Sequence, residues 1–194
     1  VRLDAGTLRL QSAGAISETN PTITVAGNAT LEADTTSTAS FGALTINDGI
    51  TLTVAGADGG TDFASLTAIA PSESALIAPN AGDTVTIGSA LSLGDGATFT
   101  SSGAGTTVFT GAPVLGATAT IGSLGTLDLG GALSIGATQT VNITGSAAGI
   151  VKTSELQAPG ATVAINFADG ATLSTPVFND AAAAKQINLT GNGA

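Results

Sequence analysis

The stretch Leu44 to Leu52, LTINDGITL, shows the pattern from which the fold is predicted. Its first three residues alternate apolar and polar, as in a strand with one buried face. Asn-Asp-Gly in the middle favours a turn, because Gly accepts a positive φ and Asn or Asp side chains bond to nearby backbone. The last three residues resume the alternation. The stretch therefore predicts two short strands joined by a three-residue corner, with the apolar side chains pointing inward.

The same nine-residue unit recurs along the chain. Each full copy has Thr in its eighth position, and the starts of successive copies are separated by uneven steps. Uneven steps favour a coil whose loops vary in length over a strictly coded short repeat. The other full copies are 23–31 (ITVAGNATL), 91–99 (LSLGDGATF), 133–141 (LSIGATQTV) and 165–173 (INFADGATL), and weaker copies lie at 1–8, 77–85 and 119–127.

Small side chains dominate the predicted interior. The chain is 43% hydrophobic with a mean hydropathy of +0.43, yet only 3% aromatic, and all its aromatic residues are Phe. A β-sandwich usually fills its core, about 10 Å thick, with large aromatic residues, whereas small residues allow parallel strands to stack about 4.8 Å apart. We therefore predict an all-β fold, a parallel β-solenoid with irregular rungs and an interior of Val, Ile, Leu and Ala. An antiparallel, pilin-like β-sandwich is the alternative.

We expect residues 1–194 to form a single solenoid domain, which is either complete or a fragment or processed part of a longer chain, since Val1 is not an initiator Met. Pro and clustered Gly interrupt the alternation in several places, which predicts loops that leave the stack. One short Ala-rich stretch resembles a helix and is expected to be a cap or lateral turn. The predicted loops are 56–61, 70–83, 101–105 and 145–160, and the Ala-rich stretch is 179–186.

Charge and composition exclude several classes of function. Four basic residues stand against fourteen acidic ones, a net charge of -10, so phosphate backbones and anionic bilayers repel the chain. No apolar window reaches the roughly 18 residues of a membrane span. We therefore expect no nucleic-acid partner and no membrane insertion. Without His or Cys the chain cannot form a Ser-His-Asp triad, a thiolate nucleophile or a common zinc or haem site, and we predict that it is not an enzyme.

Calcium is the one cofactor that the sequence leaves open, because its ligands are oxygen atoms. Asp58 and Asp62 flank a double Gly and are the best candidate ligands. Asp48, Asp95 and Asp169 each precede a corner Gly and would form an acidic ladder if the rungs stack in register. The simpler interpretation of every Asp-Gly pair is turn chemistry.

Three short pieces resemble the passenger regions of bacterial autotransporters and related secreted adhesins: Gly6 to Leu10 (GTLRL), Gly125 to Leu129 (GTLDL) and Ala171 to Leu173 (ATL). The acidic, Cys-free composition is also similar to that of bacterial surface-layer proteins. The autotransporter resemblance implies a right-handed β-helix at a bacterial surface, with adhesive or structural work.

These observations predict an extracellular or cell-surface structural protein, a building block of a filament, sheath or layer. Val1 begins inside a repeat unit and residues 187–190 resemble a strand, so we expect both ends to be uncapped and to associate end to end by strand addition. An adhesin shaft or carbohydrate-binding passenger, with a surface glycan as partner, is the main alternative. A polysaccharide-active enzyme and an ice-binding solenoid, suggested by Thr-x-Thr pieces such as 98–100, are further alternatives. Asn28, Asn142 and Asn188 begin N-x-T sequons.

Overall fold

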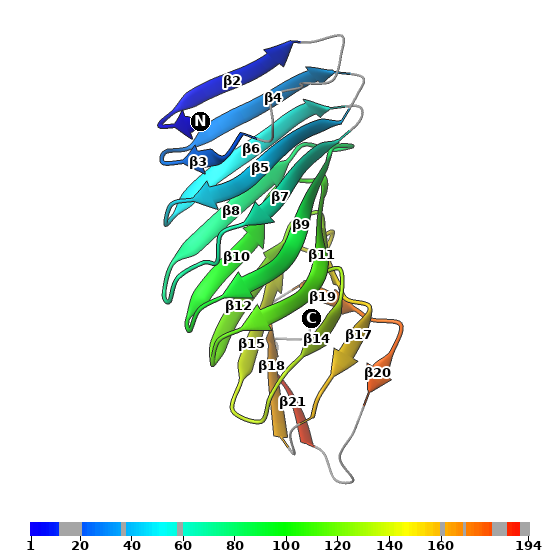
Figure 1. The fold of residues 1–194 in the computed structure, drawn as a ribbon. Helices are drawn as coiled ribbons and strands as arrows, with labels where there is room; N and C mark the ends of the chain where they lie inside the picture. Colours follow the sequence, from blue (N-terminus) through cyan, green and yellow to red (C-terminus); the bar gives the residue numbers. More distant parts are fainter. Residues whose placement is uncertain are drawn as a thin grey trace.

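Parallel strands stacked in a coil make up the molecule. The computed structural model describes residues 1–11, 21–35, 38–57, 60–159, 162–168, 170–179 and 186–190. Within these residues, 21 strands form three sheets, and every pairing between strands is parallel. Figure 1 shows the strands piled from the N-terminal end to the C-terminal end. The predicted parallel β-solenoid is confirmed, and the antiparallel sandwich is wrong.

Two sheets of nine strands run the length of the coil and a third sheet joins them in its C-terminal part. Sheet A contains β1 (Arg2–Leu3), β3 (Ile23–Val25), β5 (Ala39–Ile46), β7 (Thr61–Leu66), β9 (Thr84–Leu93), β11 (Thr106–Leu115), β13 (Thr126–Asp128), β16 (Ile150–Lys152) and β19 (Thr172–Ser174). Sheet B contains β2 (Gly6–Gln11), β4 (Ala29–Thr35), β6 (Ile50–Ala57), β8 (Ser74–Pro79), β10 (Ala97–Ser101), β12 (Thr118–Ser123), β15 (Thr140–Gly145), β18 (Thr162–Phe167) and β21 (Gln186–Thr190). Sheet C contains β14 (Ala132–Ser134), β17 (Glu155–Gln157) and β20 (Phe178–Asn179).

One turn of the coil passes through sheet A, a corner, sheet B and a second corner. Residues that lie beside each other on neighbouring turns are close to 22 residues apart in sequence, as for the hydroxyls of Thr45 and Thr67. The spacing varies from turn to turn: Thr106 pairs with Thr126, and Ile50 pairs with Ala75. The strand register also shifts between β9 and β11 after Phe109. The predicted irregular rungs are thus confirmed.

The nine-residue unit marks both corners of a turn. Copies at 23–31, 44–52 and 91–99 lead from sheet A into sheet B, whereas those at 77–85 and 165–173 lead from sheet B back into sheet A. Copies that follow each other closely are therefore the two corners of one turn. This alternation explains the uneven steps.

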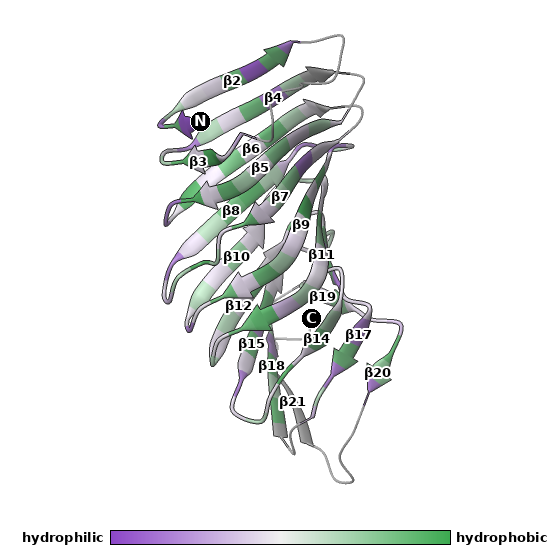
Figure 2. Cartoon of the chain, viewed as in Figure 1, coloured by the Kyte–Doolittle hydropathy of each residue, from purple (hydrophilic) through white to green (hydrophobic). Residues whose placement is uncertain are grey.

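The predicted inward direction of the apolar residues is correct. In the unit at 91–99, Leu91 and Phe99 are completely buried and Leu93 is 3% exposed. The Ser and Thr residues between them are only partly buried. Figure 2 shows the resulting alternation of apolar and polar residues along the strands. The core is one continuous column of buried side chains from the first turns to β18.

Phenylalanine also fills this column, contrary to the expectation of an interior of small aliphatic residues alone. Phe41 and Phe63 stack with their ring centroids 5.3 Å apart. Phe99 and Phe109 meet edge to face at the same centroid distance. All four rings are buried. The chain has only six Phe residues, and four of them lie in this column.

Two of the four predicted loops contain strands. Residues 70–83 include β8, and residues 145–160 include β16 and β17. Proline misled the prediction at β8, because Pro79 is the last residue of the strand, where its missing N–H is tolerated. The predicted loops at 56–61 and 101–105 overlap strand ends, and residues 58–59 lie outside the described residues. The helix-like stretch 179–186 lies mostly outside the described residues.

The C-terminal turns have three faces. Where β9 and β11 run as single strands of ten residues, the later turns carry a pair of short strands, such as β13 and β14 or β16 and β17. Thr153 lies buried at one of these breaks. Its Oγ1 accepts the N–H of Leu133 at 3.0 Å and lies 2.6 Å from the carbonyl oxygen of Gly131, to which it donates. This buried hydroxyl satisfies backbone groups that the broken strand would leave unpaired.

Candidate functional site

Side-chain oxygens at the corners from sheet A to sheet B bond to the backbone of the next turn. In each case a carboxylate or amide oxygen accepts the N–H of a residue at the start of the following sheet B strand. This contact closes the corner and fixes one turn on the next, so it gives the corner Asp residues a structural role. The pairs are Asn28 with Thr51 at 2.9 Å, Asp48 with Ser74 at 2.8 Å and Asp95 with Thr118 at 2.8 Å.

Of the best predicted calcium pair, Asp58 and Asp62, only Asp62 lies within the described residues. Asp62 lies on β7, partly buried, with Ser40 and Thr86 as its register neighbours. Asp58 and Asp169 lie outside the described residues. Over the described part of the chain, no group of three or more His, Cys, Asp and Glu residues is arranged to hold a metal ion. Calcium binding by these residues therefore stays a prediction.

The acidic residues on successive corners are not the three that were predicted. Asp48 and Asp95 do not lie on neighbouring turns, because the corner between β7 and β8 separates them and carries Glu73. The Asp169 unit joins β18 to β19, a corner of the opposite kind. The ladder on three successive corners is thus Asp48, Glu73 and Asp95. Sequence reasoning missed Glu73 because it lies outside the nine-residue unit.

A pocket opens where the chain between β7 and β8 changes its partner. The N–H of Thr67 still bonds to Leu44 on the previous turn, at 2.8 Å, whereas the N–H of Ile69 bonds to Ser92 on the next turn, at 3.0 Å. Between these two residues the segment leaves β5 and approaches β9. The space left behind has a volume of about 510 Å³, and we call it the corner pocket.

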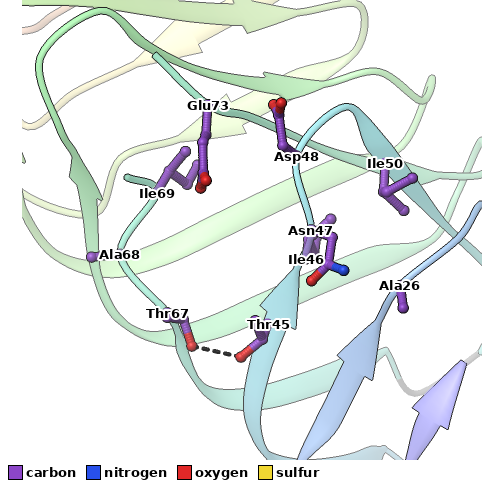
Figure 3. A pocket seen from close by; sticks show the side chains of 10 residues that line it. All are labelled: Ala26, Thr45, Ile46, Asn47, Asp48, Ile50, Thr67, Ala68, Ile69 and Glu73. Carbon is purple, nitrogen blue, oxygen red and sulfur yellow. Dashed lines mark hydrogen bonds between the residues drawn. The ribbon is translucent and has the colours of Figure 1, made fainter. Parts of the chain in front are cut away.

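The corner pocket combines an apolar wall with polar groups at its two ends. Figure 3 shows Asp48 and Glu73 at one end, and at the other the hydroxyls of Thr45 and Thr67, which share a hydrogen bond of 2.7 Å. The Asp48 carboxylate is held in place, because Oδ1 also accepts the Ser74 hydroxyl at 3.2 Å. The lining residues are Ala26, Thr45, Ile46, Asn47, Asp48, Ile50, Thr67, Ala68, Ile69 and Glu73.

A second pocket, of about 450 Å³, lies where sheets A and C separate. Asp128 and Lys152, register neighbours on β13 and β16, both line it. The Asp128 carboxylate accepts the N–H of Gly130 at 2.9 Å and so helps to close the break between β13 and β14. The pocket follows from that break, which the sequence did not reveal.

The fold and these corners place the protein in the class of parallel β-solenoids. No protein-family model, no curated protein and no solved structure matches the chain. Among the described residues, no helix has the length and apolar character needed to cross a membrane.

Replacing Asp95 with Ala is expected to destabilise the protein by about 1 kcal/mol, because the N–H of Thr118 loses its acceptor. Asp95→Asn is the matched control. It keeps an oxygen acceptor at the same place, as Asn28 does at its own corner, so its free energy of unfolding should stay close to that of the parent. Urea unfolding measures both. Equal losses in the two variants would contradict the acceptor role.

A melting experiment distinguishes calcium binding by the corner carboxylates from their role as hydrogen-bond acceptors. If calcium relieves repulsion along the ladder of Asp48, Glu73 and Asp95, removing it with a chelator lowers the melting temperature of the parent. The same treatment should have a smaller effect on the double variant Asp48→Asn with Asp95→Asn, which keeps both acceptors but loses two charges. A melting temperature that the chelator leaves unchanged in the parent would overturn calcium binding at these corners.

Proposed function

We propose that this chain is a non-enzymatic structural protein of the cell surface or extracellular space, a building block of a filament, sheath or layer that assembles end to end. The absence of His and Cys and the net charge of -10 support a role without catalysis or nucleic acid. The stacked fold supports it further. Each turn of a solenoid contacts only the turns next to it, so another copy can extend the stack along its axis.

The observation that carries the proposal is the first turn. Among the described residues, β1 pairs only with β3 and β2 only with β4. Leu8 and Leu10 on β2 are only partly buried, whereas their partners on β4, Leu31 and Ala33, are completely buried. Within the described residues, the first turn therefore leaves Leu8 and Leu10 partly uncovered, and an added strand that continues the stack would cover them.

At the other end of the stack, Val177 and Phe178 are about half exposed. Because the strand pairings of the described residues are all parallel, a joint that continues the stack brings the β1 and β2 edge of one copy against the last turn of another. Such a head-to-tail contact joins two different surfaces of the protein. Each added copy therefore leaves a free surface for the next one, and the chain of copies grows without closing into a ring. The proposed product is a filament, which lateral contacts would turn into a sheath or layer.

Sedimentation velocity over a range of concentrations, with and without calcium, tests the proposal. We expect the 194-residue chain to form species larger than the monomer, and Leu10→Lys, which places a charge at the open edge, to remain monomeric. Thr53→Lys is the control, because Thr53 is partly buried in the interior strand β6 of sheet B and its change should leave assembly intact. A parent chain that stays monomeric at every concentration would contradict assembly and favour the alternative of an adhesin shaft.

A further inference from the structure

Beyond the proposed assembly, and independently of it, we propose that the corner pocket binds a primary alkylammonium group. The pocket brings together Asp48 from one corner, Glu73 from the next corner and an isoleucine wall from three elements. These groups lie within a cavity of about 510 Å³, a size typical of sites for small organic ligands. Their chemistry defines both the charge and the frame of the ligand.

The charge of the ligand follows from the lining residues. Two of the ten are acidic and none is basic, and the whole chain carries a net charge of -10. An anion would therefore be repelled from the pocket, whereas a cation is attracted to it. An ammonium group has three N–H donors and no acceptor, which matches a pair of carboxylates.

The isoleucine residues of the pocket indicate that the ligand carries a short carbon chain. Ile46, Ile50 and Ile69 line the space beside the carboxylates. A calcium ion needs six to eight oxygen ligands, which an isoleucine wall cannot supply. A short carbon chain attached to the ammonium group buries apolar surface against the same wall. No group of three or more His, Cys, Asp and Glu among the described residues is arranged to hold a metal ion, so the lining favours an organic cation in this pocket.

The Asp48 carboxylate and the Glu73 backbone are positioned without the ligand. Oδ1 of Asp48 accepts the N–H and the hydroxyl of Ser74, and these bonds hold the carboxylate at the corner that lines the pocket. Glu73 is fixed through its backbone, by its N–H to Ala70 at 3.1 Å and its carbonyl to Thr98 at 2.9 Å, while its side chain is exposed at the mouth. The hydroxyl pair of Thr45 and Thr67 at the far end accepts a second polar group on the same carbon chain.

Alkylammonium groups come from two sources, a free diamine or a lysine side chain of a partner peptide, and two probes separate them. Each probe, 1,4-diaminobutane and N-acetyl-lysine amide, is titrated into the ¹⁵N-labelled chain and followed by NMR. We expect saturable shifts at the amides of Ile46, Asp48 and Ile69, with a dissociation constant on the order of 1 mM. Binding of the diamine alone supports the free amine, and binding of the lysine probe alone supports the peptide. 1-Butanol, which has the carbon chain without the charge, should cause no saturable shift.

Two variants make the test specific. Glu73→Gln removes one charge of the pocket and should weaken binding about fivefold, equivalent to about 1 kcal/mol, with an unchanged melting temperature. Asp95→Asn removes the same charge from the next corner, outside the pocket lining, and should leave the affinity unchanged. The proposal is overturned if neither probe saturates, if Glu73→Gln binds as tightly as the parent, if Asp95→Asn weakens binding equally, or if calcium shifts the same amides at lower concentration than either amine.

Discussion

Replacing Phe109 with Ala is expected to lower the free energy of unfolding by about 3–5 kcal/mol. The Phe109 ring is completely buried and packs edge to face on Phe99 from the opposite sheet. Its removal leaves a cavity in the centre of the column, and the stacked backbones on either side are held in place by their own hydrogen bonds, which limits collapse into the space. The strands above and below then lose contacts as well.

Phe178→Ala is the matched control for this prediction, since the same ring is removed from β20, where the side chain is 45% exposed. Its loss should change the free energy of unfolding by less than about 1 kcal/mol. Urea unfolding followed by circular dichroism near 218 nm, the usual β-sheet band, measures both variants. Similar losses for Phe109→Ala and Phe178→Ala would contradict a core that is continuous through β11.

Gly130→Ala is expected to cost about 3 kcal/mol or more, because two effects add at this position. Gly130 joins β13 to β14 with a φ of +72°, which strains any residue with a Cβ. In addition, a Cβ built at this position overlaps the carbonyl oxygen of Phe109 on the turn before. That carbonyl belongs to a backbone in the middle of the sheet, so it cannot move aside cheaply.

Gly49→Ala isolates the first of these effects. Gly49 has a similar φ of +70°, but a Cβ there meets no other atom within 4 Å. We expect this control to lose only about 1–2 kcal/mol. Urea unfolding of both variants gives the comparison. If Gly49→Ala is as damaging as Gly130→Ala, close stacking of turns at the break between sheets A and C is wrong.

The local part of the fold was predictable because it depends on short-range chemistry. In Leu44 to Leu52, Asn-Asp-Gly set the corner as the structure has it, and Leu44 and Leu52 are buried as predicted, whereas Ile46 and Ile50 are only partly buried because they line the corner pocket. The choice of a column over a sandwich was also predictable, since only six Phe residues are available. The sequence did not reveal that some consecutive units are the two corners of one turn while others are the same corner on successive turns, because that depends on the length of a whole turn.

The candidate site was less predictable, for a physical reason. Asp48 and Asp95 stood out because each precedes a corner Gly, whereas Glu73 precedes β8 in a stretch that Pro71 and Pro79 mark as a loop. The corner pocket arises because Ile69 bonds forward to Ser92 instead of backward to β5. Which neighbouring turn a backbone N–H bonds to depends on contacts between residues more than 20 positions apart. A local sequence pattern therefore cannot predict it.

Engineered cysteine pairs test the parallel stack most directly, because the natural chain has no cysteine. Thr84 and Thr106 are register neighbours in sheet A, and Thr98 and Thr120 are register neighbours in sheet B. Neighbouring parallel strands lie about 4.8 Å apart, within the range of Cα separations that a disulfide bridges, about 4.4–6.8 Å. The pair Thr84 with Thr98, on different sheets, is the control.

The measurement is disulfide formation in the folded protein under mild oxidation, read by mass spectrometry after digestion. The parallel β-solenoid predicts that Thr84→Cys with Thr106→Cys and Thr98→Cys with Thr120→Cys both close without a loss of melting temperature, while Thr84→Cys with Thr98→Cys stays reduced. Failure of both register pairs, or efficient closure of the control, would contradict the stacked turns of the parallel β-solenoid.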